Sequence, residues 1–448
     1  MKPHTFMSRV TRPGRHFMCS TVLLLVALLV LHPRAQGQLV NGRFVTSLYT
    51  WEKFDTVNSS KTYLRGFQNV QLAIAEGDVS LNTYLQGAVN TDGSVGLIRA
   101  YNLYLRWANI GKAVDVSLGR QAIYAGAGYG TIDGISARLR LLEGRVTVTG
   151  YGGAAPSQDF SGVRKDYHDN LNFGGQVVTT AIPGARVGVS YLNRSEKRDP
   201  YWTLRARDSS FNAVPYYVTF QPEAEELVSG DAYYTYAKLF SVYGRYDYDV
   251  HDSKTARIQA GGRVTVTPDV ALTADYMHRL PRVSYNSIFS AFTLNAVDEI
   301  EGGVEYSFSR LVRGFARLAS VSYSDEKSTR WTVGVNAGYG SVSYSGSNGY
   351  AGELQSFTLQ GVYPLLDNMV VPSVGISFAS YRLSPEDSRN DAWSLVLGGT
   401  VRPSRTFSFD VQGQWMTNTV YARDLRALVK LNYWFAERLS LFGQEVGQ

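Results

Sequence analysis

The sequence predicts an all-β protein, an antiparallel transmembrane β-barrel of about 18–22 strands that follows an N-terminal signal peptide. From about residue 40 to the C-terminus, stretches of roughly ten residues alternate apolar and polar side chains between turn-forming residues. After residue 37, no apolar run approaches the roughly 20 residues that a membrane-spanning helix needs. Together these observations favour strands over helices as the membrane-crossing elements.

Residues 1–37 have the three parts of a secretory signal. An apolar run at 21–31 is too short to anchor the chain, and 35–37 (Ala-Gln-Gly) supplies small residues for cleavage. We therefore predict a signal peptide over residues 1–37 and a single barrel domain over 38–448. The basic residues of the leader are Lys2, Arg9, Arg12, Arg15 and Arg34.

The net charge of +6 comes mostly from this leader. Without its five basic residues, 39 basic and 38 acidic residues remain, so the mature chain is almost neutral. The basic balance therefore gives no reason to expect nucleic-acid binding. The single cysteine, Cys19, also lies in the leader, which leaves neither a disulfide nor a thiolate metal site. We expect no cofactor and no metal.

Twenty-two strand positions can be placed along the chain from the two-residue alternation. Each lies between turn-forming residues, and the same alternation of apolar and polar side chains continues from the first predicted strand to the last. The predicted centres are Thr46, Val70, Tyr84, Leu103, Leu118, Ser136, Thr149, Gln176, Val189, Tyr233, Tyr246, Gly261, Ala274, Val304, Leu318, Val335, Ser343, Leu359, Ile376, Leu397, Val411 and Val429.

The predicted connections alternate between short turns and longer loops, as short periplasmic turns and long external loops do in outer-membrane barrels. Longer connections fall at 155–170, 194–225 and 281–296. A turn at 436–438 followed by a short strand from Leu439 to Phe442 would give an odd total, and we expect an even one. The short turns are predicted at 76–78, 143–144, 182–184, 268–269 and 309–310.

The segment 118–121 (Leu-Gly-Arg-Gln), followed by the glycine-rich 126–135, has the order strand, tight loop, Asp-Gly and returning strand. With the alternation over 38–448, it resembles bacterial outer-membrane porins and porin-like channel proteins. The resemblance implies a place in the outer membrane after export, with lipid around the barrel. It also implies insertion by the barrel assembly machinery and the possibility of a homotrimer.

The third external loop, within 118–135, departs from general porins because it has only about ten, nearly uncharged residues. We expect it to be too short to fold far into the lumen. The spacing of Gly126, Gly128 and Gly130 lacks the strand-to-helix context of a phosphate-binding loop and predicts a tight external hairpin.

The polar face of the strands is expected to line an aqueous lumen, because barrels of about 16 or more strands are not filled by side chains. The predicted pore-lining basic residues are Arg106, Arg138, Arg140, Arg145, Arg257, Arg263, Arg426 and Lys430. The predicted pore-lining acidic residues are Asp247, Asp249, Asp275, Glu299, Glu301 and Glu305.

These two sets occupy different strands, so they predict a basic and an acidic wall facing each other across the pore. Such walls would orient dipolar solutes and select ions by charge. In the alternative interpretation, the charges only pair with one another and stiffen the wall. Outward-facing aromatics are predicted to form a girdle at the membrane interface: Trp107, Trp393, Phe407, Trp415 and Tyr433.

The long connection 194–225 combines arginines with aromatic rings, which suit anions and sugars respectively. A constriction or binding role is predicted for it. The candidate contacts are Arg198, Tyr201, Trp202, Arg205 and Arg207.

An enzyme would need a nucleophile and a base, and the mature chain has only His168, His251 and His278 as histidines. His278 has lipid-facing parity, where an outer-membrane phospholipase would keep its base, but no serine partner is recognisable. A non-enzymatic function is therefore expected.

The function predicted from sequence is passive diffusion of small hydrophilic solutes or ions through the barrel. Two alternatives stay open: a non-conducting structural, adhesive or assembly-related barrel, and an export channel for an anionic polysaccharide. Conductance would separate a channel from a structural barrel. Steep anion selectivity with block by uronic-acid oligomers would favour export.

Overall fold

The computed structural model describes residues 38–55, 60–90, 98–157, 159–162, 166–197, 200–206, 213–219, 223–281, 295–324, 326–350, 352–384 and 386–439. Within these ranges the chain is built of strands, with one 3₁₀ turn, η1 (Tyr167–Asp169). No helix in the described ranges is both long and apolar enough to cross a membrane.

The barrel strands are β1 (Gln38–Asp55), β2 (Ser60–Glu76), β3 (Val79–Asn90), β4 (Arg99–Ile110), β5 (Val114–Ala125), β6 (Gly128–Leu141), β7 (Val146–Ala154), β8 (Leu171–Thr179), β9 (Ala185–Glu196), β12 (Glu223–Tyr236), β13 (Phe240–Asp249), β14 (Lys254–Thr265), β15 (Val270–Arg279), β16 (Val297–Ser307), β17 (Val312–Tyr323), β18 (Glu326–Ala337), β19 (Gly340–Gly349), β20 (Glu353–Val362), β21 (Val370–Arg382), β22 (Asn390–Ser404), β23 (Phe407–Thr417) and β24 (Tyr421–Leu439). A separate hairpin consists of β10 (Tyr201–Ala206) and β11 (Ala213–Val218).

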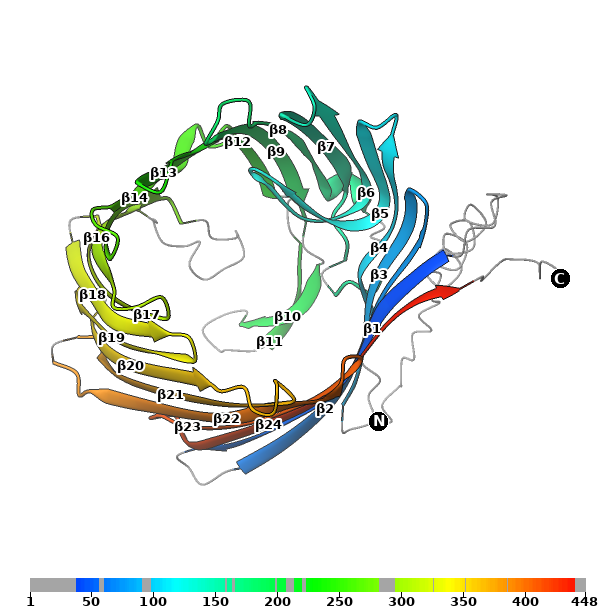
Figure 1. Ribbon diagram of the computed structural model, residues 1–448. Coiled ribbons are helices and arrows are strands. Elements are labelled where there is room, and N and C mark those ends of the chain that lie inside the picture. Colours follow the sequence, from blue (N-terminus) through cyan, green and yellow to red (C-terminus); the bar gives the residue numbers. More distant parts are fainter. Residues whose placement is uncertain are drawn as a thin grey trace, which may run out of the picture.

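The 22 barrel strands form one closed antiparallel sheet (Figure 1). Closure joins the two ends of the chain, because Arg43 on β1 lies opposite both Gln71 on β2 and Trp434 on β24. A closed sheet satisfies its backbone hydrogen bonds from strand to strand and leaves no edge, which a bilayer requires. The sequence prediction of a barrel with an even number of strands is confirmed. The chain thus has the architecture of a porin-like β-barrel.

All 22 predicted strand centres fall in different barrel strands. The turn predicted at 436–438 is wrong, because these residues continue β24. They pair with the first residues of β1, for example Arg438 with Leu39 and Ala436 with Asn41. Because β1 begins at Gln38, it offers partners that keep β24 extended up to Leu439. The rest of the possible additional strand, 440–442, lies outside the described residues.

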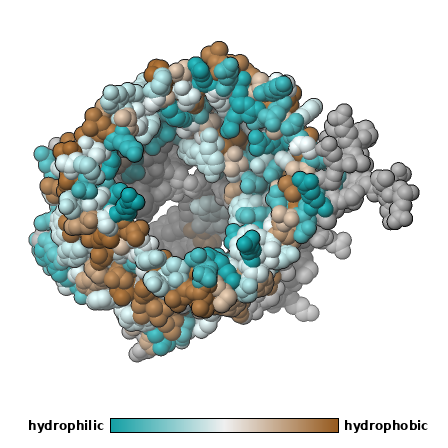
Figure 2. All heavy atoms as spheres, in the orientation of Figure 1, coloured by the Kyte–Doolittle hydropathy of each residue, from teal (hydrophilic) through white to brown (hydrophobic). Residues whose placement is uncertain are grey.

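Side chains alternate between an apolar outer face and a polar inner face. On β16, Ile300 and Val304 are exposed at 63% and 41% on the outer face, whereas Glu299, Glu301 and Glu305 take the inner face. In Figure 2 the molecule is hollow at its centre, with many hydrophilic residues around the opening and apolar groups on the outer side. Four exposed aromatic residues of the predicted girdle lie on the outer face: Trp107, Trp393, Trp415 and Tyr433.

The ends of β5 and β6 leave the wall and fold into the barrel, as Figure 1 shows for the cyan hairpin beside β9. The hairpin rests on the inner face of β7, β9 and β12, where it buries Leu192 completely. The expectation that this connection could not reach far into the lumen is wrong, since the flanking strands supply the length. Its buried contacts are Ile123, Ala125, Ala127, Ile132, Tyr151, Leu192 and Leu227.

Glycines let this hairpin lie flat on the wall. A Cβ on Gly128 would come within 2.2 Å of the Tyr151 hydroxyl oxygen, and one on Gly126 within 2.2 Å of Ser190 Oγ. Gly126 also has a φ of +65°, which the two-residue turn requires. The glycine spacing thus serves a tight hairpin, as predicted, but the hairpin turns inward.

Arg120 holds the root of the hairpin. Its Nε and Nη2 donate to the two carboxylate oxygens of Asp133 at 2.6 and 2.7 Å. The remaining N–H groups reach the carbonyls of Ala100 and Phe160, both at 3.0 Å, and of Gly162 at 2.7 Å. All five guanidinium N–H groups are therefore used. This side chain ties β5 and β6 to β4 and to the 155–170 connection.

Candidate functional site: the lumen wall

The inner wall divides into sectors of different chemistry. Amides and tyrosines line β1–β4, ion pairs line β12–β18, and hydroxyl groups line β19–β22. Cross-strand partners share a face of the sheet, so the register assigns each inward side chain to its sector.

Asp115 on β5 lies between two of the predicted pore-lining arginines. Arg106 on β4 approaches its carboxylate at 3.1 Å, and Arg140 on β6 at 3.0 Å. The Asp115 side chain is only 8% exposed, so this pairing satisfies a nearly buried charge. Arg138, two residues before Arg140, is exposed to the lumen, and no carboxylate of the described residues lies within ion-pair distance of it.

The arginine–acid lattice is the set of inward ion pairs on β12–β18. At its centre, Asp247 on β13 accepts hydrogen bonds from Arg245 at 2.8 Å and Arg257 at 2.5 Å. Ser229 Oγ on β12 donates to the same carboxylate at 2.5 Å. The Asp247 side chain is 3% exposed. Three hydrogen-bond donors therefore replace the water that this carboxylate loses.

The lattice continues on β16–β18. Glu305 pairs with Arg263 at 3.3 Å and with Arg313 at 3.6 Å. Arg330 on β18 contacts both Glu299 and Glu301, and the distance to Glu301 is 3.1 Å. Each of these glutamates therefore has an arginine partner one or two strands away.

The predicted acidic wall is therefore wrong as a separate surface. Arginines interleave with Asp247, Glu299, Glu301 and Glu305 and neutralise them within the same sector. Cross-strand opposite charges stabilise a sheet, whereas a run of like charges would oppose it. Asp275 accepts a hydrogen bond from the Tyr243 hydroxyl at 2.6 Å. Asp249, which is buried, accepts the backbone N–H of Asp252 at 3.1 Å.

Most other predicted basic residues also face the lumen. Arg257 and Arg263 belong to the lattice, while Arg426 pairs with Asp424 at 2.8 Å and Lys430 lies 3.7 Å from Asp410. Arg145 differs, since it is exposed in the turn between β6 and β7 and lies on no strand. Arg145 therefore lies at the end of the barrel that carries this short turn, and not in the predicted pore-lining set.

A latch joins the inward hairpin to the ends of β9 and β12 that flank the hairpin of β10 and β11. Arg194 Nη2 lies 2.7 Å from Glu225 Oε2 and donates to the Tyr129 hydroxyl at 3.1 Å. The backbone N–H of Ala127 donates to Ser190 Oγ at 2.8 Å. These contacts hold the hairpin tip against the wall, so the hairpin reduces the lumen cross-section at a fixed place.

The 155–170 connection is also tied to β9. Lys197 Nζ donates to Asp169 at 2.8 Å, and the backbone N–H of Lys197 donates to Asn170 Oδ1 at the same distance. The hydrogen bond that Lys197 donates to the Asp169 carboxylate raises the pKa of Lys197 above its usual value. Through Phe160 and Gly162, this connection supports the Arg120 anchor of the hairpin.

The predicted contacts of the long connection lie partly on the hairpin of β10 and β11, which sequence analysis missed. Tyr201, Trp202 and Arg205 belong to β10, and Trp202 packs on Tyr217 with ring centroids 4.9 Å apart. Trp202 is 69% exposed. In Figure 1 this hairpin is drawn inside the ring of barrel strands. Arg198 and Arg207 lie outside the described residues.

The hydroxyl sector occupies the inner face of β19–β22. Ser345 and Ser356 share a hydrogen bond at 2.7 Å, and Ser394 accepts one from Gln414 at 3.0 Å. The inward positions 341–347, 356–360, 373–379 and 394–400 carry no charged side chain. The hydroxyl sector consists of Ser341, Ser343, Ser345, Ser347, Ser356, Thr358, Ser373, Ser377, Ser394 and Thr400.

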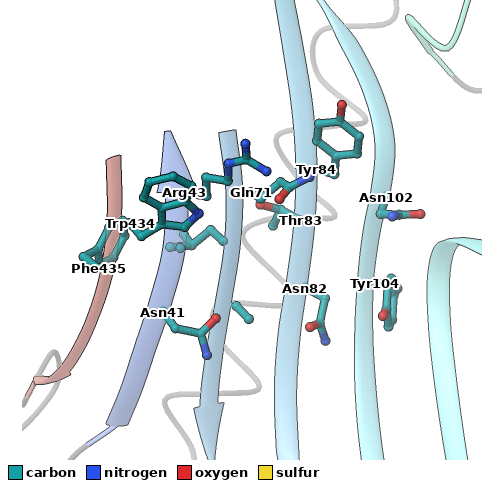
Figure 3. Close-up of a pocket in the computed structure, with 13 residues that line it drawn as sticks. Asn41, Arg43, Gln71, Asn82, Thr83, Tyr84, Asn102, Tyr104, Trp434 and Phe435 are labelled. Atoms are coloured by element: carbon teal, nitrogen blue, oxygen red, sulfur yellow. The ribbon is translucent and has the colours of Figure 1, made fainter. Parts of the chain in front are cut away.

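The amide recess is a hollow of about 560 Å³ in the wall of β24 and β1–β4 (Figure 3). Its side chains come from five neighbouring strands and are mostly amides and phenols. The polar and aromatic lining residues are Asn41, Arg43, Gln71, Asn82, Tyr84, Asn102, Tyr104 and Trp434.

His278 lies on the outer face of β15. Its Nδ1 is 2.9 Å from Asp298 Oδ1, and the Tyr276 hydroxyl donates to the same oxygen at 2.8 Å. The cross-strand partners of His278 are Ile258 and Asp298, while Ser322 lies opposite Asp298 and is therefore one strand further away. This arrangement gives His278 a carboxylate partner and no adjacent serine in the register.

Sequence analysis missed the residues that complete the ion pairs. Inward parity was available as a signal for Asp115 on β5 and for Arg317 and Arg330 on β17 and β18, which face the lumen like their neighbours. The alternation of inward and outward residues does not, however, give the shift of one strand along the next. That shift decides which charged side chains come into contact. The amide recess was missed because asparagine and glutamine are ordinary on any polar inner face.

No family model and no curated protein matches this sequence. Among solved structures, the translocation pore of the P pilus usher PapC is similar with a TM-score of 0.47 and 10% identity, over 88% of this chain and 99% of that one. OpdQ of Pseudomonas aeruginosa has a TM-score of 0.42 and 10% sequence identity, and the match covers 89% of this chain and 98% of OpdQ. OccK2 (OpdF) of Pseudomonas aeruginosa, solved in complex with glucuronate, also has a TM-score of 0.42 and 10% sequence identity. That match covers 90% of this chain and 100% of OccK2. Similarities this distant leave the function to be argued from the lumen itself.

Proposed function

We propose that this protein is a passive outer-membrane channel for small hydrophilic solutes, with a modest preference for anions. The observation that carries the proposal is the closed ring of 22 strands with polar side chains inside and apolar side chains outside. A barrel of this many strands encloses more space than its inward side chains fill. Water and small solutes are the natural contents of such a lumen.

The outer face supports the membrane location. Exposed apolar residues cover the strands, and Trp107, Trp393, Trp415 and Tyr433 supply rings suited to the headgroup region. Closed antiparallel barrels satisfy every backbone group within lipid, which is the requirement for a membrane-spanning sheet. Export by the predicted signal peptide, insertion by the barrel assembly machinery and a homotrimer remain predictions.

The anion preference follows from a surplus of arginine in the lumen. Asp115, Asp247 and Glu305 each face two arginines, so each of these clusters retains positive charge. Arg138 adds an exposed guanidinium without a carboxylate partner in the described residues. Positive charge on a pore wall raises the local concentration of anions and lowers that of cations.

The inward hairpin of β5 and β6 supplies size selection. It is fixed at its root by Arg120 and at its tip by the latch, and its apolar underside is buried against the wall. A fixed obstacle excludes solutes by size more sharply than a mobile one. At the depth of the hairpin, the cross-section of the proposed channel is therefore smaller than a barrel of 22 strands would otherwise have.

Solute influx into liposomes tests this function. The full chain is expressed, purified from the membrane fraction and reconstituted, and osmotic swelling is followed in solutes of increasing size. We expect swelling for small solutes and a steep decline with size. A folded barrel, recognised by its heat-modifiable migration, that produces no swelling with any solute would contradict the proposal and favour a structural barrel.

A further inference from the structure

We infer that the amide recess is a binding subsite for a neutral monosaccharide on its way through the lumen. This inference rests on the proposed channel function and assigns a class of solute to it. The recess draws its lining from β24 and β1–β4, so it exists only because the barrel closes between the first and last strands.

The polar groups of the recess match a polyhydroxylated ring. Asn41, Gln71, Asn82 and Asn102 offer amide groups, each with a donor and an acceptor on adjacent atoms. A sugar hydroxyl also donates and accepts, so an amide is its natural complement. Figure 3 shows these side chains on neighbouring strands, with Tyr84 and Tyr104 among them. The recess volume lies in the range of small-molecule sites.

An aromatic surface lies at the β24 side of the recess. Trp434 faces the lumen, and the guanidinium carbon of Arg43 is 5.2 Å from its ring centroid. Trp434 is partly exposed, so a solute is able to reach it from the lumen. Aromatic side chains combine a large apolar face with a polar N–H, a combination that suits the apolar C–H face and hydroxyl edge of a sugar.

The charge of the recess favours a neutral ligand over an ion. Arg43 is the single charged residue in its lining, and its Nη2 donates to Asn432 Oδ1 at 2.6 Å. The amide nitrogen of Asn432 donates in turn to Asp410 at 2.8 Å and to Ser408 at 3.1 Å. Arg43 is therefore held toward Asn432 on β24 by its hydrogen bond, while the four amide side chains of the lining are uncharged.

The recess lies in the periplasmic half of the lumen. Asn82 follows the short Gly77–Asp78 turn by four residues, and Asn41 lies near the start of β1. The inward hairpin arises from an external connection, at the opposite end of the strands. A sugar that has passed the hairpin would therefore meet the recess before it leaves the channel.

The test is the effect of D-glucose on single-channel current of the full protein, purified from the membrane fraction, in a planar bilayer. We expect reversible current reduction that saturates with glucose concentration. The double variant Asn82→Ala/Asn102→Ala should raise the half-blocking concentration about tenfold, as expected for the loss of one to two hydrogen bonds. The matched control Ser343→Ala/Ser345→Ala removes two polar groups from the hydroxyl sector and should leave that concentration unchanged.

Conducting channels whose current falls with glucose only in proportion to viscosity, equally in all variants, would overturn the subsite and leave the channel function standing. Saturable block by D-glucuronate without block by D-glucose would also overturn it, because charge would then dominate recognition. If no variant conducts, the channel function fails. Saturation-transfer NMR of D-glucose on the detergent-solubilised barrel then decides the subsite: transfer that is lost in the Asn82→Ala/Asn102→Ala variant supports it, and equal or absent transfer overturns it.

Discussion

The arginine–acid lattice of β12–β18 and the hydroxyl sector of β19–β22 are neighbouring parts of one inner wall with opposite chemistry. The lattice pairs each of its carboxylates with at least one arginine, and the nearly buried Asp247 lies between two. The hydroxyl sector holds serines and threonines that bond weakly with one another, as Ser345 does with Ser356. Both faces are polar, yet only the first depends on matched charges.

The difference shows that charge in a lumen and charge selectivity are distinct properties. In the lattice, most charged side chains form ion pairs with other side chains of the wall, and these pairs stiffen it. The net electric field in the lumen therefore comes from the arginines that outnumber their carboxylate partners. In the hydroxyl sector, a solute meets neutral donors and acceptors. The channel is therefore expected to favour anions only modestly despite its many ionised side chains.

The largest expected effect is the loss of a lattice centre. Asp247→Asn leaves Arg245 and Arg257 without their shared carboxylate and should lower the free energy of unfolding by about 2 kcal/mol, less than for a fully buried pair because both arginines are partly exposed. Urea unfolding of the barrel in detergent measures this change. Ser343→Ala in the hydroxyl sector is the control and should stay within about 0.5 kcal/mol. Equal effects of the two variants would break the comparison.

The second effect concerns the hairpin beside the lattice. Gly128→Val would place a methyl-bearing Cβ 2.2 Å from the Tyr151 hydroxyl oxygen, so either the hairpin or the Tyr151 ring must shift. Because Tyr151 is itself buried, we expect the hairpin to move off the wall toward the lumen axis. Single-channel conductance should fall by roughly a third and become noisier, as expected for a narrowed pore. Gly150→Val on β7 meets nothing within 4 Å and should conduct normally. A normal conductance in Gly128→Val would show that the hairpin does not limit the current.

The third effect separates selectivity from stability. Arg138→Gln removes an arginine that has no carboxylate partner in the described residues, so it should move the reversal potential toward cations by on the order of 5 mV and leave stability unchanged. Arg140→Gln removes a partner of Asp115 and should also lower the free energy of unfolding by about 1 kcal/mol. Reversal potentials and urea unfolding of both variants are the measurements. If Arg138→Gln and Arg140→Gln lowered the free energy of unfolding equally, the distinction between an arginine that only sets selectivity and one that also stabilises the barrel would be refuted.

The smallest effect belongs to the hydroxyl sector. Ser356→Ala breaks the hydrogen bond with Ser345 and should cost less than about 1 kcal/mol of unfolding free energy. Its reversal potential should equal that of the unmodified protein, because no charge changes. A measurable shift in selectivity would mean that neutral hydroxyls, and not only arginines, set the ion preference.

The barrel itself was predictable because two-residue alternation is written in local sequence. Every predicted centre from Thr46 to Val429 found its own strand, and the Gly77–Asp78 turn lies where the sequence placed it. In the register, Arg138, Glu301 and Arg426 share a face of the sheet with Asp115, Ala319 and Gln414 respectively. These features need no knowledge of distant contacts.

What failed to follow from sequence depends on residues far apart in the chain. The inward turn of the hairpin is fixed by contacts such as Ala127 with Ser190, 63 residues later. The predicted acidic wall is not a separate surface, because the register brings Arg330 within ion-pair distance of Glu299. The inward or outward parity of a residue does not specify how far neighbouring strands are shifted along one another. The turn predicted at 436–438 failed because closure onto β1 gives those residues strand partners.

The most direct test of the channel and its arginine surplus is the reversal potential of the unmodified protein in a planar bilayer under a salt gradient. Stable conductance steps are predicted, with a reversal potential on the anion-selective side but well short of the ideal anion value. Absence of steps from a folded, heat-modifiable barrel would contradict the channel. Steps with clear cation preference would contradict the arginine surplus as the source of its selectivity.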